Sequence, residues 1–287
     1  MREATAFSPG HITGLFQICR HRDVMRTGSR GAGFSIALGA SSRVTVRKGL
    51  GRCTVKIDGA PAEAPVTHAA ISHLLGGAPL DVRVETELQL PLSQGFGMSA
   101  AGVLSASLAL VEALEKERKE AFIAAHLAEV HCGSGLGDVA GIMCAGVELR
   151  SKEGLPPFGE VERIQGDFEL ILAQVGPCIE TSSVIMDRER EERINAAGRR
   201  CLSQLRKRPE VGSLFSLSAR FAEESGLIGE RVKEALSAIA DLGRGSMCMI
   251  GNSVFVTGDD LDMIEVALRP FGKTYRAHLD HAGAKLL

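Results

Sequence analysis

Residues 91–102 read PLSQGFGMSAAG, a run of small residues between two segments of regular pattern. Upstream, residues 81–90 (DVRVETELQL) alternate apolar and polar side chains, which predicts a strand with one face in solvent. Downstream, residues 99–117 repeat apolar side chains at helical spacing. One stripe of that helix holds Leu104, Leu108, Val111 and Leu114. The pattern therefore predicts a tight glycine turn that leads from a strand into a helix.

Three interpretations of this turn compete. The first is a structural turn, because glycines start many helices. The second is a dinucleotide site, since Gly95, Gly97 and Ala100 match G-x-G-x-x-A. That fold needs a strand buried on both faces and a second strand soon after, where a second helix (120–131) is predicted here. The third is a phosphate site, in which the free amides of residues 95–99 and the positive end of the helix dipole face an anion.

Composition excludes several classes of function. The formal net charge of the 287 residues is −2, so no basic field draws the chain to nucleic acid or to anionic lipid. There is no Trp and only one Tyr, which argues against base stacking. No apolar run is long enough to span a membrane, and the first residues lack the apolar core of a signal peptide. The seven Cys contain no C-x-x-C pair, so we expect a reduced, cytoplasmic protein.

Other segments predict the remaining elements. Residues 44–57 read as a hairpin around Gly49–Gly51, and residues 66–76 as a short helix that ends at glycine. Residues 151–160 (SKEGLPPFGE) are the best candidate for a linker. After them, the pattern predicts a buried strand, helices over 186–208 and 213–240, two strands around Gly251, a helix with an Asp cap and a last strand. This is the split βαββαβ order.

Several motifs together resemble a known family. PLSQGFGMSAAG resembles the P-x-x-x-G-L-G-S-S-A-A signature of the GHMP small-molecule kinases. Residues 7–16 (FSPGHITGLF) resemble their N-terminal motif, and residues 246–256 (SMCMIGNSVFV) lie where their third motif is found. With RTGSRGAGFS and HCGSGLGDVAG, these stretches are most similar to the archaeal pantoate-kinase branch. The chain departs from many relatives at His11, where they carry Lys, and at Met98, which replaces the first Ser of the signature.

The resemblance implies a fold and an activity. The fold would be α+β, with a ribosomal-S5-like nucleotide-binding domain over residues 1–155 and a ferredoxin-like domain over residues 156–287. The activity would be ATP-dependent phosphorylation of (R)-pantoate to (R)-4-phosphopantoate in archaeal coenzyme A biosynthesis, with ATP and Mg²⁺ as cofactors. Residues of the signature would hold the nucleotide: Pro91, Gly95, Phe96, Gly97, Met98, Ser99, Ala100 and Ala101.

The resemblance also assigns the catalytic groups. Ser99 and Glu129 would hold Mg²⁺, and Asp138 would accept or orient the proton of the pantoate hydroxyl. The residues agree in part, because Phe122, His126 and Glu129 share one helical stripe, and buried polar groups on such a stripe suggest a cavity. A helix with two polar faces remains an alternative. Asp138 taken alone would also suit a helix cap.

Pantoate is an anion, so we expect its carboxylate to meet arginine, hydroxyl or amide donors. Arg30, in a glycine-rich stretch, is the main candidate for this contact. The full set of predicted substrate residues is Ser29, Arg30, His126, Arg150 and Thr181. The predicted partners are this substrate and the nucleotide, without nucleic acid or membrane, and a homodimer is left open. Two other functions are also left open: a sister kinase for another small alcohol, such as homoserine or mevalonate, and a silent nucleotide-binding regulator.

Overall fold

The computed structural model describes residues 1–179 and 188–287, and within them the strands form two sheets. In the larger sheet the strand order is β12-β1-β2-β5-β3-β4, and β6 and β7 continue from β2. The smaller sheet has the order β11-β8-β10-β9. Helices and strands both contribute, so the predicted α+β class is confirmed. None of the described helices is both long and apolar enough to cross a membrane.

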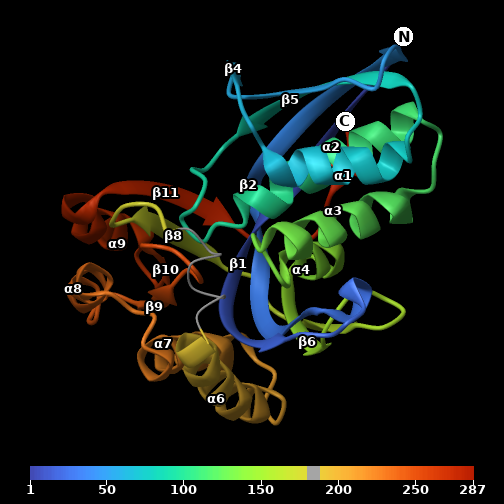
Figure 1. Cartoon of the computed structure of the whole chain (residues 1–287). Helices are drawn as coiled ribbons and strands as arrows, with labels where there is room; N and C mark the ends of the chain where they lie inside the picture. Colours follow the sequence, from blue (N-terminus) through green and yellow to red (C-terminus); the bar gives the residue numbers. More distant parts are fainter. Residues whose placement is uncertain (180–187) are drawn as a thin grey trace.

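A long two-stranded antiparallel ribbon runs through the molecule (Figure 1). It consists of β1 (Arg2–Cys19) and β2 (Gly28–Lys48), which are joined through a short 3-10 turn, η1 (Val24–Arg26). The pairing shifts register between Pro9 and Gly10 and again between Thr13 and Leu15. Such bulges bend a strand and increase its twist. The ribbon can therefore contribute to both halves of the molecule.

The predicted hairpin over residues 44–57 is wrong. β3 (Cys53–Ile57) does not pair with β2, because β5 (Leu80–Leu88) lies between them, antiparallel to β2 and parallel to β3. The chain reaches β5 through α1 (Pro65–Leu75), which ends at Gly76 as predicted. The short and outer strands of this sheet are β4 (Ala60–Pro61), β6 (Val147–Lys152), β7 (Glu160–Ile164) and β12 (Lys285–Leu286).

Helices cover one end of the ribbon (Figure 1). α2 (Met98–Ala113) packs on β1 and β2, and α1 and α3 (Arg118–Cys132) pack on α2. α2 is consequently buried on nearly all sides rather than along one stripe. The short α4 (Asp138–Cys144) contacts β1, β2 and β6. The glycine turn thus lies at the buried end of a central helix.

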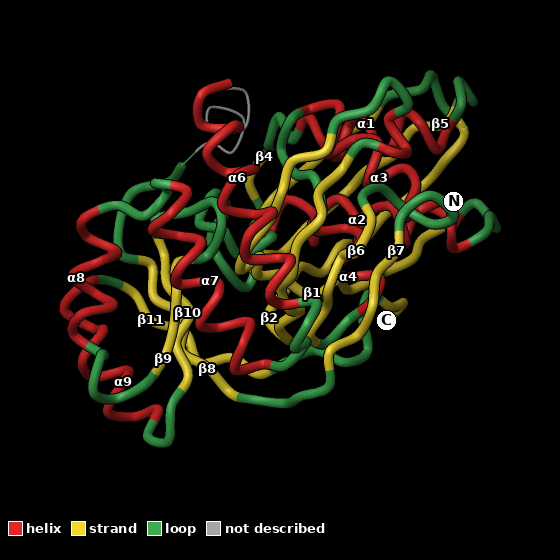
Figure 2. Tube along the Cα trace, turned by 90° about the horizontal axis from the view of Figure 1, so that it is seen from below, coloured by secondary structure: helices red, strands yellow, loops and turns green. Residues whose placement is uncertain are grey.

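The second half confirms the predicted split βαββαβ order, and its sheet lies beside the ribbon (Figure 2). The helical pattern predicted over residues 213–240 forms two helices, and the first of them ends where Gly226 takes φ 69°. The strands are β8 (Glu169–Gln174), β9 (Arg244–Met247), β10 (Ser253–Thr257) and β11 (Lys273–His278). The helices are α6 (Arg188–Leu205), α7 (Val211–Ser225), α8 (Glu230–Ala238), α9 (Leu261–Leu268) and the 3-10 turn η2 (Arg269–Phe271).

Residues 151–160 are not an interdomain linker. They include the connection of a hairpin, because β6 and β7 on either side pair antiparallel in the larger sheet. One aromatic cluster joins the halves, in which Phe34 of β2 contacts Phe215 of α7 and Phe255 of β10. Rings packed edge to face add about 0.5–1.5 kcal/mol per pair beyond their burial. The halves therefore share a core, and the division between residues 155 and 156 stays a prediction.

Two glycines near the start of α2 should respond oppositely to alanine. Gly97 takes φ 68°, and a Cβ there would lie 2.6 Å from the carbonyl oxygen of His11. Gly97→Ala should lower the free energy of unfolding by roughly 1–3 kcal/mol. Gly102 is inside the helix, and its Cβ would find its nearest neighbour at 3.9 Å. Gly102→Ala should raise the free energy of unfolding by about 0.5–1 kcal/mol.

Urea denaturation of both variants beside the native chain measures these changes. Equal effects of the two substitutions would contradict the close approach of the turn to β1.

Candidate active site

Close backbone contacts on two sides shape the glycine turn. On one side, a Cβ at Gly97 would meet the backbone of His11 in β1. On the other side, a Cβ at Gly95 would lie 2.6 Å from the carbonyl oxygen of Cys248. A Cβ at Gly251 would strike the backbone of Gln94. The turn is thus pressed between β1 and the β9–β10 connection, at distances that only glycine allows.

Hydrogen bonds hold the turn in this position. The amide of His11 donates to the carbonyl oxygen of Phe96 at 3.2 Å. The side-chain amide of Gln94 donates to the carbonyl oxygen of Gly176 at 3.1 Å, and the hydroxyl of Ser253 donates to the carbonyl oxygen of Gln94. Segments from both halves therefore fix the backbone at the start of α2.

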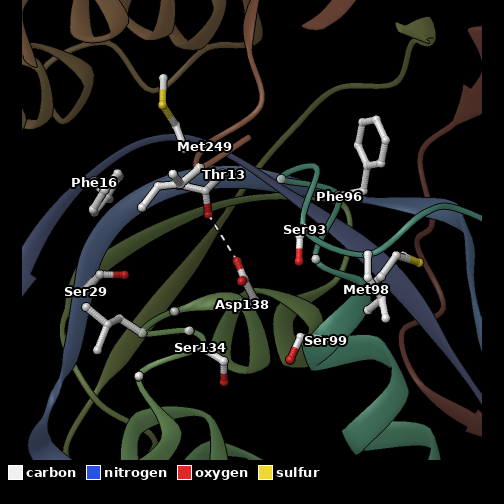
Figure 3. A pocket seen from close by; sticks show the side chains of 18 of the residues that line it. Thr13, Phe16, Ser29, Ser93, Phe96, Met98, Ser99, Ser134, Asp138 and Met249 are labelled. Atoms are coloured by element: carbon white, nitrogen blue, oxygen red, sulfur yellow. Dashed lines mark hydrogen bonds between the residues drawn. The ribbon is translucent and has the colours of Figure 1, made fainter. Parts of the chain in front are cut away.

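A cavity of about 310 Å³ opens in front of this turn (Figure 3). Its other wall is the glycine-rich connection between α3 and α4, and Met249 closes one side. Serine side chains from three segments surround Asp138 in this space. The lining consists of Thr13, Phe16, Ser29, Leu92, Ser93, Gly95, Phe96, Gly97, Met98, Ser99, Cys132, Gly133, Ser134, Gly135, Leu136, Gly137, Asp138, Met249 and Ile250.

Glu129 lies just behind the cavity wall and bonds to two lining hydroxyls. Ser99 donates to its Oε1 at 2.5 Å, and Ser134 donates to the same oxygen at 2.8 Å. The Cβ of any other residue at Gly135 would collide with Oε2. Burial removes the carboxylate from water, and this raises its pKa from 4.5 to about 7. A cation beside this group would favour its ionised form.

Asp138 begins α4, and its side chain is 25% exposed. Oδ1 contacts Nδ1 of His11 at 2.8 Å and accepts a hydrogen bond from the hydroxyl of Thr13 at 3.3 Å. Burial alone would raise the pKa of this carboxyl, but the hydrogen bond and charge of His11 outweigh it and lower the pKa below its usual value. Asp138 is therefore an ionised carboxylate at neutral pH.

The predicted residues of the signature divide into two groups. Gly95, Phe96, Gly97, Met98 and Ser99 line the cavity. The other three, Pro91, Ala100 and Ala101, do not line the cavity. Both alanines are fully buried in the hydrophobic core.

The predicted substrate residues also separate. Ser29 lines the cavity, but Arg30, its neighbour in β2, does not. Successive strand residues point to opposite faces, and Arg30 pairs with Glu153 at 2.6 Å. Hydrogen bonds from Arg30 and His21 overcome the effect of burial and hold the pKa of Glu153 at about 2. The structure therefore places Arg30 outside the cavity lining and in a pair with Glu153, and its contact with the substrate carboxylate stays a prediction.

Of the other predicted residues, His126 and Arg150 are not in the lining either. His126 is buried, and Nε2 lies 3.3 Å from the carbonyl oxygen of Val24, so it joins α3 to η1 instead of facing the cavity. Burial lowers its pKa. Arg150 is only 1% exposed and lies behind Ser29 and Gly137. Thr181 is outside the described residues.

The sequence pattern missed several residues of the site. Ser93 and Ser134 lie in the two glycine-rich loops, where hydroxyls beside glycines were a usable signal. Thr13 belongs to a long strand and carried no signal. Glu148 is fully buried in β6, two residues before Arg150. Opposite charges at alternate positions of an apolar strand indicate a buried ion pair, and this signal was present.

Comparisons with known proteins agree with this geometry. A family model described as the GHMP kinases N terminal domain matches residues 66–146. The pantoate kinase of Methanocaldococcus jannaschii is 32% identical over 252 residues, which cover 87% of this chain and 90% of the relative. The pantoate kinase of Methanospirillum hungatei is 31% identical over 295 residues, which cover 100% of this chain and 97% of the relative.

Solved structures extend the likeness. A protein described as a phosphotransferase related to the CoA biosynthesis pathway has a TM-score of 0.89 at 28% identity, covering 99% of this chain and 98% of that protein. Galactokinase from Lactococcus lactis, solved with galactose, has a TM-score of 0.74 at 13% identity, covering 98% and 94%, which shows the fold alone.

Relatives this similar along nearly their whole length show the family. The chain belongs to the GHMP kinases, as the motifs predicted, and it has their fold. Within that family it is similar to the two pantoate kinases named above.

Glu129 makes stability depend on pH in a defined direction. Its pKa is about 7 in the fold and 4.5 in the unfolded chain, so the folded state binds the proton more tightly. The stabilisation that protonated Glu129 provides is complete below 4.5, its pKa in the unfolded chain. It is lost as the pH rises through about 7, its pKa in the folded protein. In the presence of a chelator, the native chain should lose up to about 3 kcal/mol relative to Glu129→Gln between about pH 5 and about pH 8.

Urea denaturation at a series of pH values, on both proteins, measures this difference. Parallel stability profiles for the two proteins would contradict the raised pKa.

Proposed function

We propose that this chain transfers the γ-phosphoryl group of ATP to the primary hydroxyl of (R)-pantoate, giving (R)-4-phosphopantoate. The observation that carries the proposal is that an amide-rich turn and an ionised aspartate face one another across a single cavity. Phosphoryl transfer needs this combination of phosphate binding and an oriented acceptor. The choice of pantoate is supported by the similarity to pantoate kinases over nearly the whole chain.

In this proposal the nucleotide phosphates lie against the start of α2. The helix has no side-chain cap, since Gly97 precedes its first residue, and three backbone N–H groups at positions 98–100 lack carbonyl partners within the helix. The positive end of the helix dipole adds to their attraction for phosphate. The small side chains of the turn let the phosphate approach the backbone.

Ser99 and Glu129 would hold Mg²⁺ beside these phosphates. Both offer oxygen ligands, which Mg²⁺ prefers, and they lie within 2.5 Å of one another at the cavity wall. The described residues hold no group of three or more His, Cys, Asp or Glu side chains that could bind a metal. That agrees with Mg²⁺ bound through one or two protein groups and the nucleotide phosphates. The ion would neutralise the charge that develops on the transferred group.

Asp138 would receive or orient the proton of the acceptor hydroxyl. Its carboxylate is ionised and exposed in part, as a general base requires. Oδ1 is held by His11 and Thr13, which leaves Oδ2 as the oxygen free to contact the acceptor.

The carboxylate of pantoate would lie toward Ser29. The hydroxyl of Ser29 lines the cavity, and Arg150 supplies positive charge behind it. Nε of Arg150 is buried and has no hydrogen-bond partner among the described residues. We also place the enzyme in the cytoplasm, since all seven cysteines are free thiols, as a reducing compartment would keep them.

Turnover with a panel of acceptors tests the activity. The purified chain with ATP and Mg²⁺ should phosphorylate pantoate much faster than homoserine or mevalonate. Asp138→Asn should lower kcat by about 10²–10⁴-fold, because the acceptor loses its proton partner, and should leave pantoate bound. Faster turnover of another alcohol would assign the chain to a sister kinase, and no turnover with any acceptor would favour a nucleotide-binding regulator.

Two neighbouring positions in β2 test where the substrate carboxylate lies. Ser29→Ala should raise the KM for pantoate by about ten- to a hundred-fold, because it removes a hydrogen bond to a charged group. Arg30→Ala is the matched control and should change that KM less than about three-fold, because it breaks only a part-exposed pair with Glu153.

The KM for ATP should stay close to native in both variants. A larger effect of Arg30→Ala than of Ser29→Ala on the pantoate KM would place the substrate on the other face of β2.

A further inference from the structure

His11 lies fully buried between two carboxylates. Its Nδ1 is 2.8 Å from Oδ1 of Asp138, and its Nε2 is 3.1 Å from Oε1 of Glu148. The imidazole and the Glu148 carboxylate are both completely inaccessible to solvent. Ionised carboxylates only accept hydrogen bonds, so both ring nitrogens must donate to satisfy the two contacts. A neutral imidazole has one N–H group, whereas the imidazolium has two.

The surrounding backbone is shaped to admit this ring. Gly33 of β2 faces the ring, and a Cβ there would lie 3.0 Å from the ring carbon Cε1. Gly141 of α4 faces it from another side, and a Cβ there would collide with Nε2. Two elements far apart in the sequence, β2 and α4, thus each carry a glycine at the position that faces the imidazole. A larger residue at either position would displace the ring from the carboxylates.

Charges around the ring balance. The cluster contains two carboxylates, Asp138 and Glu148, and the guanidinium of Arg150, which donates to Oε1 of Glu148. With a neutral His11 the cluster would carry a net negative charge in a buried place, which is costly. With an imidazolium the charges sum to zero.

We propose that His11 is a permanently charged imidazolium that positions Asp138 for phosphoryl transfer, with Glu148 holding the far side of the ring. His11 is a positioning residue, because it touches Asp138 and not the substrate. Its Nδ1 fixes Oδ1, so that Oδ2 is directed to the acceptor hydroxyl. This inference rests on the proposed function only where it concerns turnover.

The titratable groups that face the pair are few. Asp138 of α4 and Glu148 of β6 contact His11 directly, and Arg150 of β6 donates to Glu148. Glu129 of α3 is near enough to Asp138 that the charge of Asp138 contributes, after burial, to the raised pKa of Glu129. Burial would lower the pKa of His11, but hydrogen bonds to Asp138 and Glu148 outweigh it and raise the pKa above its ordinary value. This direction agrees with the geometry.

The kinetic test uses His11→Gln, which keeps a polar side chain of similar size and removes the charge. Its kcat should fall by about ten- to a hundred-fold, with little change in either KM. The acidic limb of the kcat profile should move up by about one to three pH units, because Asp138 loses the cation that keeps it ionised.

Ser42→Ala is the matched control. Ser42 is buried and bonds to Thr86 at 2.8 Å and Ser105 at 2.7 Å, away from the cavity lining. The Ser42→Ala variant should be less stable than the native protein, but the acidic limb of its kcat profile should stay at the native pH. A profile for His11→Gln that keeps its native midpoint would overturn the proposal, since a merely structural His11 would lower the yield of folded enzyme and not the apparent pKa.

A second measurement does not depend on turnover. In nitrogen-15 NMR spectra of the native protein at about pH 8, both ring nitrogens of His11 should carry a proton. In Glu148→Gln the ring should lose its proton at a lower pH than in the native protein. A singly protonated His11 in the native protein at about pH 7 would overturn the proposal even if pantoate is the substrate. Failure of pantoate turnover with a doubly protonated His11 would instead overturn the proposed function alone.

Discussion

The close approach of three backbone segments is the constraint on which this structure depends. The turn before α2 touches β1 at His11 on one side and the β9–β10 connection at Cys248 on the other. Glycines at 95, 97 and 251 make these contacts possible, because any Cβ would separate the segments. The packing aligns the free amides at the start of α2 with the cavity. It also brings residues of both halves into a single wall, so neither half forms the site alone.

Electrostatics separates the roles of two carboxylates of the site, Glu129 and Asp138. Glu129 is desolvated next to two hydroxyls, and its pKa is raised to about 7. Asp138 is exposed in part, and the hydrogen bond and charge of His11 outweigh the effect of its partial burial and lower its pKa. Groups whose environments separate their pKa values in this way suit different roles. Glu129 suits binding of a cation, which would restore its charge, and Asp138 suits contact with the acceptor hydroxyl.

The positive charges of the site lie behind its walls. His11 and Arg150 are both buried, and they act on the cavity through Asp138 and through the wall at Ser29 and Gly137. Charges fixed in a region of low dielectric act strongly and need no reorganisation when a substrate binds. Buried ion pairs stabilise a fold only when their geometry is good, and the glycines at 33 and 141 leave the space in which the imidazole reaches both carboxylates.

Local pattern determined the strand, turn and helix around residues 91–102, the helix that ends at Gly76 and the split order of the second half, because these depend on near neighbours in the chain. The motif at 91–102 also located five of the lining residues. Only tertiary structure decided that β5 separates β2 from β3, since strand pairing depends on segments that arrive later in the chain. It likewise decided that Ser29 faces the cavity and Arg30 does not, because the strand pleat sends neighbours to opposite faces and packing selects which face is inside. The pairing of His11 with Asp138 and Glu148 joins positions more than 120 residues apart, and no local pattern records such a contact.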